Sequence, residues 1–256
     1  MPILAAGMIG SRNGWVEMPY VETPAGPEAL ARAVRRVRLE DGGGIFFIPG
    51  LTDASVKPFP DVMRGEETQL VGLGLARDMT VVLPGTHSKW ARIEKGRIAR
   101  FRTFATGEVF ATLSRHSFIA QMAKRQAEPD WAAFAQGLDA ARDSTQASGL
   151  LSRLFSVRTG WLAGRLRPEE MTDYLSGVIV GAEFREVADL GWFKTGDEVG
   201  IIGGAELVEV YCRAAVAFGL TPHPGPPDAA VRGCLVIAGI EVEMDDNADD
   251  SPAVRK

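Results

Sequence analysis

The sequence predicts an α/β fold in two lobes, and three observations support this prediction. Residues 1–106 alternate between strand-like apolar runs and segments of helical periodicity, which is typical of an α/β lobe. Residues 107–240 are mostly helical, and near their end they add one more strand, a Gly-Gly pair and a helix. The composition, 46% hydrophobic and 24% charged over 256 residues, suits one large domain or two modest lobes. We expect a ligand in the cleft between the lobes.

The first lobe is predicted to begin with a fully buried strand, because residues 3–9 form a continuous apolar run. Further strand-like runs cover residues 16–21, 45–48 and 80–83. Helices are expected over residues 27–40, with Pro27 at the first position and three glycines at 42–44 ending it, and over residues 65–77. After these elements, residues 89–94 and 97–104 are predicted to form a hairpin through a tight Lys95-Gly96 turn.

The second lobe is predicted to be rich in helices, over residues 108–126, 130–143, 148–165 and 168–190. A short strand at 199–202 and a helix at 205–218 follow, and Gly219 is well placed to end that helix. A proline-rich loop at 221–227 leads to a last helix at 228–238. We expect the acidic tail, residues 241–256, to be disordered.

The composition argues against several classes of protein. The net charge of −5 is unlike the basic surface of a protein that binds nucleic acid. Cys212 and Cys234 are too few for a disulfide framework or a zinc site, so we expect them to be reduced and buried. No apolar run reaches membrane-spanning length, and the first residues lack the basic region of a signal peptide. We therefore expect a cytoplasmic protein.

The segment that follows the strand at 80–83 has residue types that hold phosphate groups. Gly85 lets the backbone approach a ligand, and consecutive amides in such a turn can face anionic oxygens. Thr86 and Ser88 offer hydroxyls, and Lys89 adds a positive charge. The alternative is an ordinary polar hairpin turn, and the chain has no G-x-x-x-x-G-K-[ST] motif. His87 and Ser88 are neighbours on an extended chain and point to opposite faces, which argues against a hydrolase.

Two further segments offer groups for catalysis and substrate binding. The stretch from Asp61 to Gln69 places carboxylates at the start of a helix, where one can accept a proton from a substrate hydroxyl or simply complement the helix dipole. The glycine-rich stretch at 7–15 carries Ser11, Arg12 and Trp15 between two strands. Arg12 can fork onto a carboxylate, with Arg64 as the next candidate, or it can be solvated on a surface hairpin.

A Gly-Gly pair, Gly203-Gly204, lies between a strand and a helix N-terminus, where backbone can hold a flat or anionic group. Together with the segments above it completes a set of matching stretches: AAGMIGSRNGW (5–15), PYVETPAG (19–26), FIPGLTD (47–53), PDVMRGEETQ (60–69), LPGTHSKW (83–90), TFATGE (103–108), DYLSGVIVG (173–181) and IIGGAEL (201–207). In this order the stretches resemble the 2-dehydro-3-deoxygalactonokinase family, from about residue 3 to about residue 240.

The resemblance implies the sugar-kinase branch of the actin-like ATPase (ribonuclease H-like) fold, in which two α/β lobes close over ATP and sugar. It implies transfer of the γ-phosphoryl group of ATP, with Mg²⁺, to the terminal hydroxyl of 2-dehydro-3-deoxy-D-galactonate in galactonate breakdown. By this resemblance residues Gly85, Thr86, His87, Ser88 and Lys89 hold phosphate, and Gly203 and Gly204 hold adenosine. Glu66 takes the place of the acidic base, with Asp61 as the runner-up. The sequence leaves open whether the protein forms a homodimer.

One departure from the family pattern affects what we expect of this chain. Family members open with an Asp-Trp-Gly-Thr-Ser-like phosphate segment upstream of the strand at 3–9, and this chain shows none. The resemblance assigns that aspartate to organising Mg²⁺. We therefore expect a first lobe that is incomplete at its N-terminus, either because the start codon lies upstream or because the chain is a non-catalytic, sugar-acid-binding remnant. A third option is a kinase of the same fold for another sugar or sugar acid.

Overall fold

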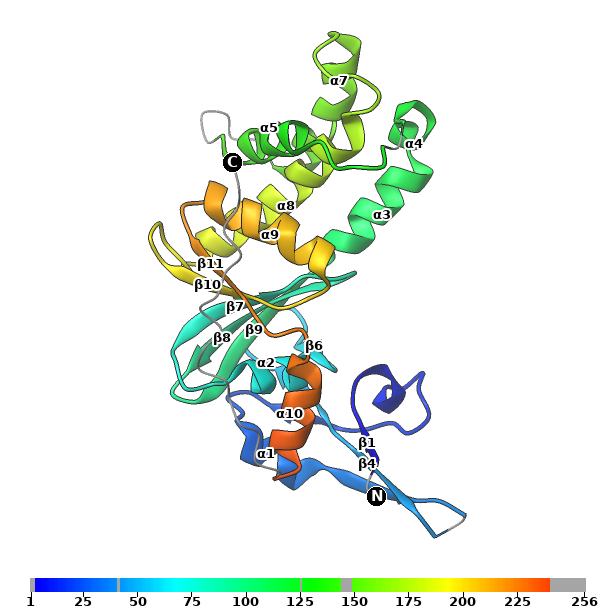
Figure 1. Cartoon of the computed structure of the whole chain (residues 1–256), viewed down its shortest axis with the longest axis vertical. Helices are drawn as coiled ribbons and strands as arrows, with labels where there is room; N and C mark the ends of the chain where they lie inside the picture. The colour runs from blue at the N-terminus through cyan, green and yellow to red at the C-terminus, as the bar shows by residue number, and fades with distance from the viewer. Residues whose placement is uncertain (1–2, 41, 125, 144–148, 240–256) are drawn as a thin grey trace.

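A five-stranded mixed sheet stands between two layers of helices in the computed structural model, which describes residues 3–40, 42–124, 126–143 and 149–239 (Figure 1). Its strand order is β11-β10-β7-β8-β9. β7 and β11 each pair with β10 in parallel, and β8 pairs antiparallel with both β7 and β9. The strands are β7 (Met79–Leu83), β8 (Ser88–Glu94), β9 (Arg97–Phe104), β10 (Glu198–Ile201) and β11 (Thr221–Pro224).

Two small sheets lie at the N-terminal end of the molecule. In the first, β4 pairs in parallel with β1 and antiparallel with β3; in the second, β5 pairs in parallel with β2 and antiparallel with β6. A short 3-10 helix, η1, follows β1. The elements are β1 (Ile3–Ala5), η1 (Gly7–Gly10), β2 (Tyr20–Glu22), β3 (Arg35–Arg38), β4 (Gly44–Phe47), β5 (Gly50–Asp53) and β6 (Asp61–Met63).

The helices divide between the two faces of the central sheet (Figure 1). One layer contains α1 (Pro27–Ala33), α2 (Glu66–Leu73) and α10 (Ala229–Ile237). The opposite side contains α3 (Thr106–His116), α4 (Phe118–Met122), α5 (Trp131–Arg142), α6 (Leu150–Leu154), α7 (Ser156–Leu162), α8 (Met171–Asp189) and α9 (Ala205–Ala217). Among the described residues, no helix has the length and apolar character needed to cross a bilayer.

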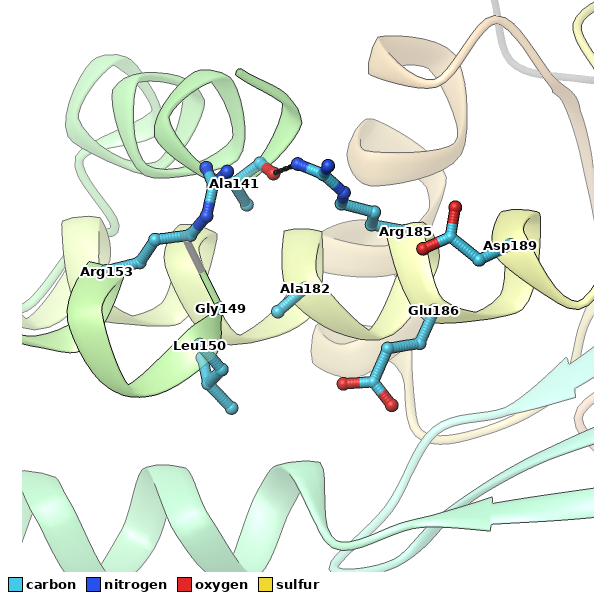
Figure 2. A pocket seen from close by; sticks show the side chains of 8 residues that line it. All are labelled: Ala141, Gly149, Leu150, Arg153, Ala182, Arg185, Glu186 and Asp189. Carbon is cyan, nitrogen blue, oxygen red and sulfur yellow. Dashed lines mark hydrogen bonds between the residues drawn. The ribbon is translucent and has the colours of Figure 1, made fainter. Parts of the chain in front are cut away.

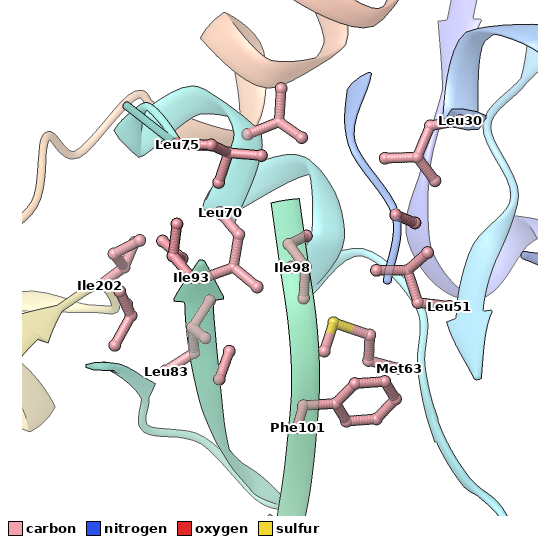
Figure 3. Close-up of a cluster of buried hydrophobic side chains, with 14 of the residues drawn as sticks. Leu30, Leu51, Met63, Leu70, Leu75, Leu83, Ile93, Ile98, Phe101 and Ile202 are labelled. Atoms are coloured by element: carbon pink, nitrogen blue, oxygen red, sulfur yellow. The ribbon is translucent and has the colours of Figure 1, made fainter. Parts of the chain in front are cut away.

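Side chains of β7 and β8 alternate between two cores, as the pleat of a strand requires. Val81 and Leu83 lie in the core on the side of α2 and α10, together with Leu70 (Figure 3). Val82 and Trp90 lie in the core on the side of α8 and α9. A third apolar cluster joins the helices from α3 to α8. The sheet is therefore covered on both faces, and only its edges and strand ends are left for a ligand.

Most of the predicted elements are confirmed within a few residues. The strands expected at 45–48, 80–83 and 199–202 correspond to β4, β7 and β10, and the hairpin corresponds to β8 and β9. The helices expected at 130–143, 168–190, 205–218 and 228–238 correspond to α5, α8, α9 and α10.

Several predictions for the first lobe were wrong. The strand expected at 3–9 ends at Ala5 and is not fully buried, because η1 turns the chain and Ile3 is half exposed; β1 lies at the edge of its sheet. The helix expected at 27–40 ends at Ala33, because Arg35–Arg38 form a strand that pairs with β4. The strand expected at 16–21 is shifted to β2, and the helix expected at 65–77 ends before Gly74.

Other differences lie in the second half of the chain. The helix expected at 108–126 breaks at Ser117, whose Oγ accepts a hydrogen bond from the Ile119 amide at the start of α4. The helix expected at 148–165 is divided into α6 and α7. The loop expected at 221–227 contains β11, which tolerates prolines because it is an edge strand. Residues 241–256 lie outside the described residues.

The lobe boundary expected at residue 106 stays a prediction. The central sheet takes strands from both sides of that boundary, since β10 and β11 join β7. The last helix, α10, also returns to the layer that contains α2 (Figure 1).

The contact between α2 and α10 depends on two glycines. A Cβ on Gly72 would lie 1.8 Å from the Ala229 carbonyl oxygen, and a Cβ on Gly233 would lie 1.7 Å from the Thr68 carbonyl oxygen. The two backbones therefore touch, and neither helix can accept a side chain at the crossing without moving.

We predict that Gly233→Ala lowers the free energy of unfolding by about 3 kcal/mol, the upper end of the usual cost of overpacking. Gly149→Ala is the matched control, because a Cβ there meets nothing within 4 Å and the φ of −80° is ordinary. Urea denaturation of both variants measures the difference. Equal stability of the two variants would show that the helices separate at little cost.

Candidate active site

Two glycine segments that are far apart in the sequence meet at one end of the central sheet. β7 and β10 are parallel neighbours, with Val82 opposite Ile201, so their carboxyl ends lie side by side. The Ile202 amide donates a hydrogen bond of 3.0 Å to the Val82 carbonyl oxygen and extends the pairing beyond β10. As a result a Cβ on Gly203 would lie 3.3 Å from Cγ of Pro84. Ligands of open α/β sheets bind just outside the carboxyl ends of the strands.

At this end of the sheet the backbone of the two glycine segments has free space around it. A Cβ on Gly85 would find its nearest neighbour, the His87 carbonyl oxygen, only at 4.0 Å, and a Cβ on Gly204 would meet nothing within 4 Å. Gly204 also precedes the 13-residue helix α9, and no side-chain cap is present at its start among the described residues. Free amides at a helix N-terminus favour an anionic or polar ligand group.

The turn that carries Gly85, Thr86 and His87 is supported by the start of α3. Gly107 lies so close that a Cβ there would be 2.3 Å from the Gly85 carbonyl oxygen. The Glu108 amide donates a hydrogen bond of 2.9 Å to the Thr86 carbonyl oxygen, and Oε2 of Glu108 lies 2.8 Å from Nε2 of His87. The turn therefore has a defined shape. The His87 side chain pairs with Glu108 at the surface of the molecule.

Ser88 and Lys89 point to opposite faces of β8. The Lys89 side chain is buried on the α2 side, and its Nζ lies 3.7 Å from Oε1 of Glu66. Ser88 is fully buried on the other side, where its Oγ and the Tyr211 hydroxyl are 2.7 Å apart. The assignment of Ser88 to phosphate binding stays a prediction; its hydroxyl is buried and hydrogen bonded to Tyr211.

The two candidate bases differ in how they are bound. Glu66 begins α2, its side chain is 27% exposed, and its Oε2 accepts a hydrogen bond of 3.0 Å from the Arg64 amide. Asp61 is held by three hydrogen bonds: from the amide and hydroxyl of Thr103, both at 2.6 Å, and from the Val62 amide at 2.8 Å. Asp61 thus joins β6 to β9, whereas Glu66 keeps Oε1 directed toward Lys89. The geometry favours Glu66 as the proton acceptor.

Arg64 is the arginine with unused donors beside Glu66. Its Nη2 donates a hydrogen bond of 2.8 Å to the Met18 carbonyl oxygen, and its guanidinium lies 4.2 Å from the centre of the Tyr20 ring. Nε and Nη1 are buried and have no hydrogen-bond partner in the described part of the chain, and the same holds for Oγ of Ser11. Unpaired buried donors are costly, so they indicate a place for a ligand.

A close approach of two glycines brings the Ser11 segment to Arg64. A Cβ on Gly65 would lie 3.2 Å from Cα of Gly7, and Gly65 has a φ of +112°, which disfavours other residues. A Cβ on Gly10 would lie 3.4 Å from Nη1 of Arg64. The structure thus brings the glycine-rich segment at 7–15 to the start of the helix that carries Glu66.

Arg12 and Trp15, in contrast, lie on the surface. The Arg12 side chain is 85% exposed and its Nε lies 3.4 Å from Oε1 of Glu17. Trp15 is more than half exposed and packs edge-on against Phe47, with ring centres 5.9 Å apart. Their assignment to the substrate stays a prediction.

Comparison with known proteins identifies the family. The family model described as 2-keto-3-deoxy-galactonokinase matches residues 1–238. The chain belongs to the 2-keto-3-deoxy-galactonokinase family. It is 36% identical to a probable 2-dehydro-3-deoxygalactonokinase of Rhizobium meliloti over 242 residues, which cover 93% of this chain and 78% of that protein. It is 35% identical to the 2-dehydro-3-deoxygalactonokinase of Escherichia coli, with 85% of this chain and 71% of the relative covered.

A solved structure agrees with this family. The crystal structure of a candidate 2-dehydro-3-deoxygalactonokinase from Sinorhizobium meliloti has a TM-score of 0.81 and 35% sequence identity to this chain. The match covers 93% of this chain and 79% of that chain. The mixed α/β architecture described above is therefore that of a galactonokinase-family protein.

Sequence reasoning missed the burial of Glu67 and of Glu183. Glu67 lies directly after Glu66 and is completely buried; its Oε2 accepts a hydrogen bond of 2.7 Å from the Gly65 amide, and its Oε1 is unpartnered in the described part of the chain. Glu183 is buried in α8. The signal for Glu183 was present, since it is the one charged residue in the apolar run from Tyr174 to Phe184. Glu67 had no such signal, because first-turn acids usually face solvent.

A pocket in the helix-rich part is separate from these residues (Figure 2). It lies between α5, α6 and α8, and it is lined by Ala141, Gly149, Leu150, Arg153, Ala182, Arg185, Glu186 and Asp189. Nη1 of Arg185 donates a hydrogen bond of 3.3 Å to the Ala141 carbonyl oxygen, while burial and then the Asp189 charge raise the pKa of Glu186. None of the sequence-predicted site residues lines this pocket.

Burial raises the pKa of Glu67 from 4.5 to about 8, although hydrogen bonds from backbone amides oppose the increase. Between these two pH values the unfolded chain ionises Glu67 while the folded protein keeps it protonated. The free energy of unfolding is therefore unaffected by Glu67 below pH 4.5 and falls as the pH rises to about 8. Each unit of difference between the two pKa values corresponds to about 1.4 kcal/mol.

We predict that Glu67→Gln removes this loss, since glutamine stays neutral and can still accept the Gly65 hydrogen bond. Urea denaturation at pH 5, 6.5 and 8 should show the stability of the original protein falling relative to the variant by several kcal/mol. Parallel stability curves for the two proteins would mean that Glu67 ionises normally in the folded state.

Proposed function

We propose that this chain is an ATP-dependent kinase that phosphorylates the terminal hydroxyl of 2-dehydro-3-deoxy-D-galactonate, and that it works in the cytoplasm in galactonate breakdown. The observation that carries the proposal is the Glu66–Lys89 pair, which lies beside the sheet end where the two open glycine segments meet. The names of the relatives give the same activity. The proposal includes the two-lobed actin-like ATPase fold.

The nucleotide would lie along the carboxyl ends of β7 and β10. Residues 85–87 and Lys89 would hold the phosphates of ATP, and Gly203 with Gly204 would face the adenosine. The open backbone at Gly85 and Gly204 supports this placement, because only a residue without Cβ lets main-chain amides come so close to a ligand.

The described residues contain no group of three or more His, Cys, Asp or Glu side chains that could hold a metal ion. Mg²⁺ commonly binds through substrate phosphates and waters with only one or two carboxylates, so the ion would reach the site together with ATP. When bound, the ion would neutralise charge on the phosphates.

In the proposed reaction the substrate hydroxyl oxygen attacks the γ-phosphorus, and the bond from that phosphorus to the bridging oxygen of ADP breaks. Glu66 accepts the proton that the hydroxyl loses, as a general base positioned at the start of α2. Lys89 is buried and 3.7 Å from Glu66, so its positive charge lies where the transferred group gains negative charge. Positioning supplies most of the catalysis in phosphoryl transfer.

The sugar acid is recognised by its carboxylate in this proposal. Arg64 has two buried donors without partners, and Ser11 adds a third unpaired group close by. A carboxylate with two oxygens matches such a fork of donors. Arg12, which is exposed and paired with Glu17, is the weaker candidate.

A coupled assay of ADP release tests the function directly. The purified protein is given ATP, Mg²⁺ and a panel of keto-deoxy sugar acids and of neutral sugars. Turnover that is fastest with 2-dehydro-3-deoxy-D-galactonate supports the proposal. Binding of the sugar acid without any turnover would instead support a non-catalytic sugar-acid-binding protein, and turnover with another sugar would change the substrate.

We predict that Glu66→Gln lowers kcat by about 10²- to 10⁴-fold, the usual effect of losing a positioned base. The dissociation constant for ATP, measured by calorimetry, should stay the same, because the amide has nearly the shape of the carboxylate. Asp61→Asn is the comparison, and it should act mainly on stability through its bonds to Thr103. Normal turnover in Glu66→Gln together with lost turnover in Asp61→Asn would move the base to Asp61.

We predict that Arg64→Lys raises KM for the sugar acid by about 10- to 100-fold, which is the effect of losing charge-assisted hydrogen bonds. KM for ATP should change little, since Arg64 lies on the Met18 and Tyr20 side of the site. Arg12→Lys is measured in parallel and is expected to have the smaller effect. If only Arg12→Lys raises KM for the acid, Arg12 is the carboxylate ligand.

A further inference from the structure

Glu183 is a charged residue buried in the layer of helices above the central sheet. It lies in α8, is 3% exposed, and both of its carboxylate oxygens accept hydrogen bonds. Oε1 accepts a bond of 2.6 Å from Nε1 of Trp90. Oε2 accepts a bond of 2.8 Å from the Tyr211 hydroxyl and a further one from the Thr106 hydroxyl.

These donors belong to the segments that surround the proposed nucleotide site. Trp90 follows Ser88 and Lys89 in β8, and Ser88 is itself hydrogen bonded to Tyr211. Thr106 is the first residue of α3 and directly precedes Gly107, which packs against the Gly85 carbonyl oxygen.

Tyr211 connects the same carboxylate to the other glycine segment. It lies in α9, the helix that starts directly after Gly204. In Figure 1 the N-terminal end of α3 and the helices α8 and α9 all lie against the same side of the central sheet. The Glu183 carboxylate therefore binds β8 and α3, which flank the turn at 85–87, and it also binds α9, the helix that follows the proposed adenosine segment.

An apolar side chain would fill this position at lower cost than a carboxylate. Burial raises the pKa of Glu183, and the hydrogen bonds from Thr106, Trp90 and Tyr211 oppose that increase. The core around it is apolar and includes Phe184 and Val187. Buried charged groups are weak contributors to stability, but a fully bonded one fixes the geometry of its partners.

We propose that Glu183 is a positioning residue that holds the turn at 85–87 and the start of α9 in the arrangement that binds ATP. The inference rests on the proposed kinase function, because the nucleotide site is part of that proposal. Glu183 itself does not touch the ligand; it acts through Thr106, Ser88 and Tyr211.

The test separates positioning from general stability. Three variants break the network with little change of shape: Glu183→Gln, Thr106→Val and Tyr211→Phe. Val187→Ala is the matched control, since Val187 is fully buried in the same helix and core but makes none of these bonds. For each protein the dissociation constants for ATP and for the sugar acid are measured by calorimetry, together with the Tm.

We expect Thr106→Val and Tyr211→Phe each to weaken ATP binding by about tenfold, the equivalent of one lost hydrogen bond to a charged group. Binding of the sugar acid should stay within about twofold, because one hydrogen bond removed from the nucleotide side leaves Arg64 unchanged. Val187→Ala should lower the Tm and leave ATP binding unchanged. Glu183→Gln should weaken ATP binding less than the other two variants, because the glutamine amide can still bond to the hydroxyls of Thr106 and Tyr211. Such a smaller effect supports the proposal.

Two results would overturn the inference. Unchanged ATP binding in both Thr106→Val and Tyr211→Phe would show that the network does not position the site. Equal weakening of ATP and sugar-acid binding, in proportion to the fall in Tm and matched by Val187→Ala, would show a purely structural role. If the original protein itself binds no ATP, the proposed function fails together with this inference, whereas normal ATP binding that is insensitive to the network removes only the inference.

Discussion

The parallel pairing of β7 with β10 is the interaction on which the candidate site depends. It aligns the carboxyl ends of two strands that are separated by most of the helix-rich part of the chain, and so it places Gly203 against Pro84. Any change of register would move one glycine segment away from the other, since each step along a strand is more than 3 Å. The Ile202 amide, bonded to the Val82 carbonyl oxygen, fixes this register at the point where the ligand would lie.

Successive side chains of β8 point to opposite faces of the sheet, so Ser88 and Lys89 have different partners. Lys89 points to the layer of α2 and meets Glu66, whereas Ser88 points to the layer of α8 and α9 and meets Tyr211. One face of the strand thus supplies charge to the proposed reaction, and the other face ties the same strand to the buried Glu183. A strand covered on both sides can serve chemistry on one face and rigidity on the other.

Much of this arrangement could be predicted from the sequence, where local pattern decides the structure. The hairpin around Lys95-Gly96, the apolar strand before Pro84 and the helix after Gly204 were all found because turn residues and periodicity mark them. β3 and β11 were missed, since Arg35–Arg38 and Thr221–Pro224 gain their extended form from pairing with β4 and β10. The burial of Ser88 and Glu67 could not be predicted, because it depends on which helix covers each face of the sheet, and no local pattern gives that.

The glycine contact between α2 and α10 also affects how the protein is made. The helix α2, which carries Glu66, is translated in the first third of the chain. The helix α10, which packs against Gly72 of α2, is synthesised only after the whole helix-rich part. Closing so long a loop is slow compared with local pairing. During synthesis the side of α2 that carries Gly72 therefore stays without its partner until α10 has been made, and the candidate site is completed late.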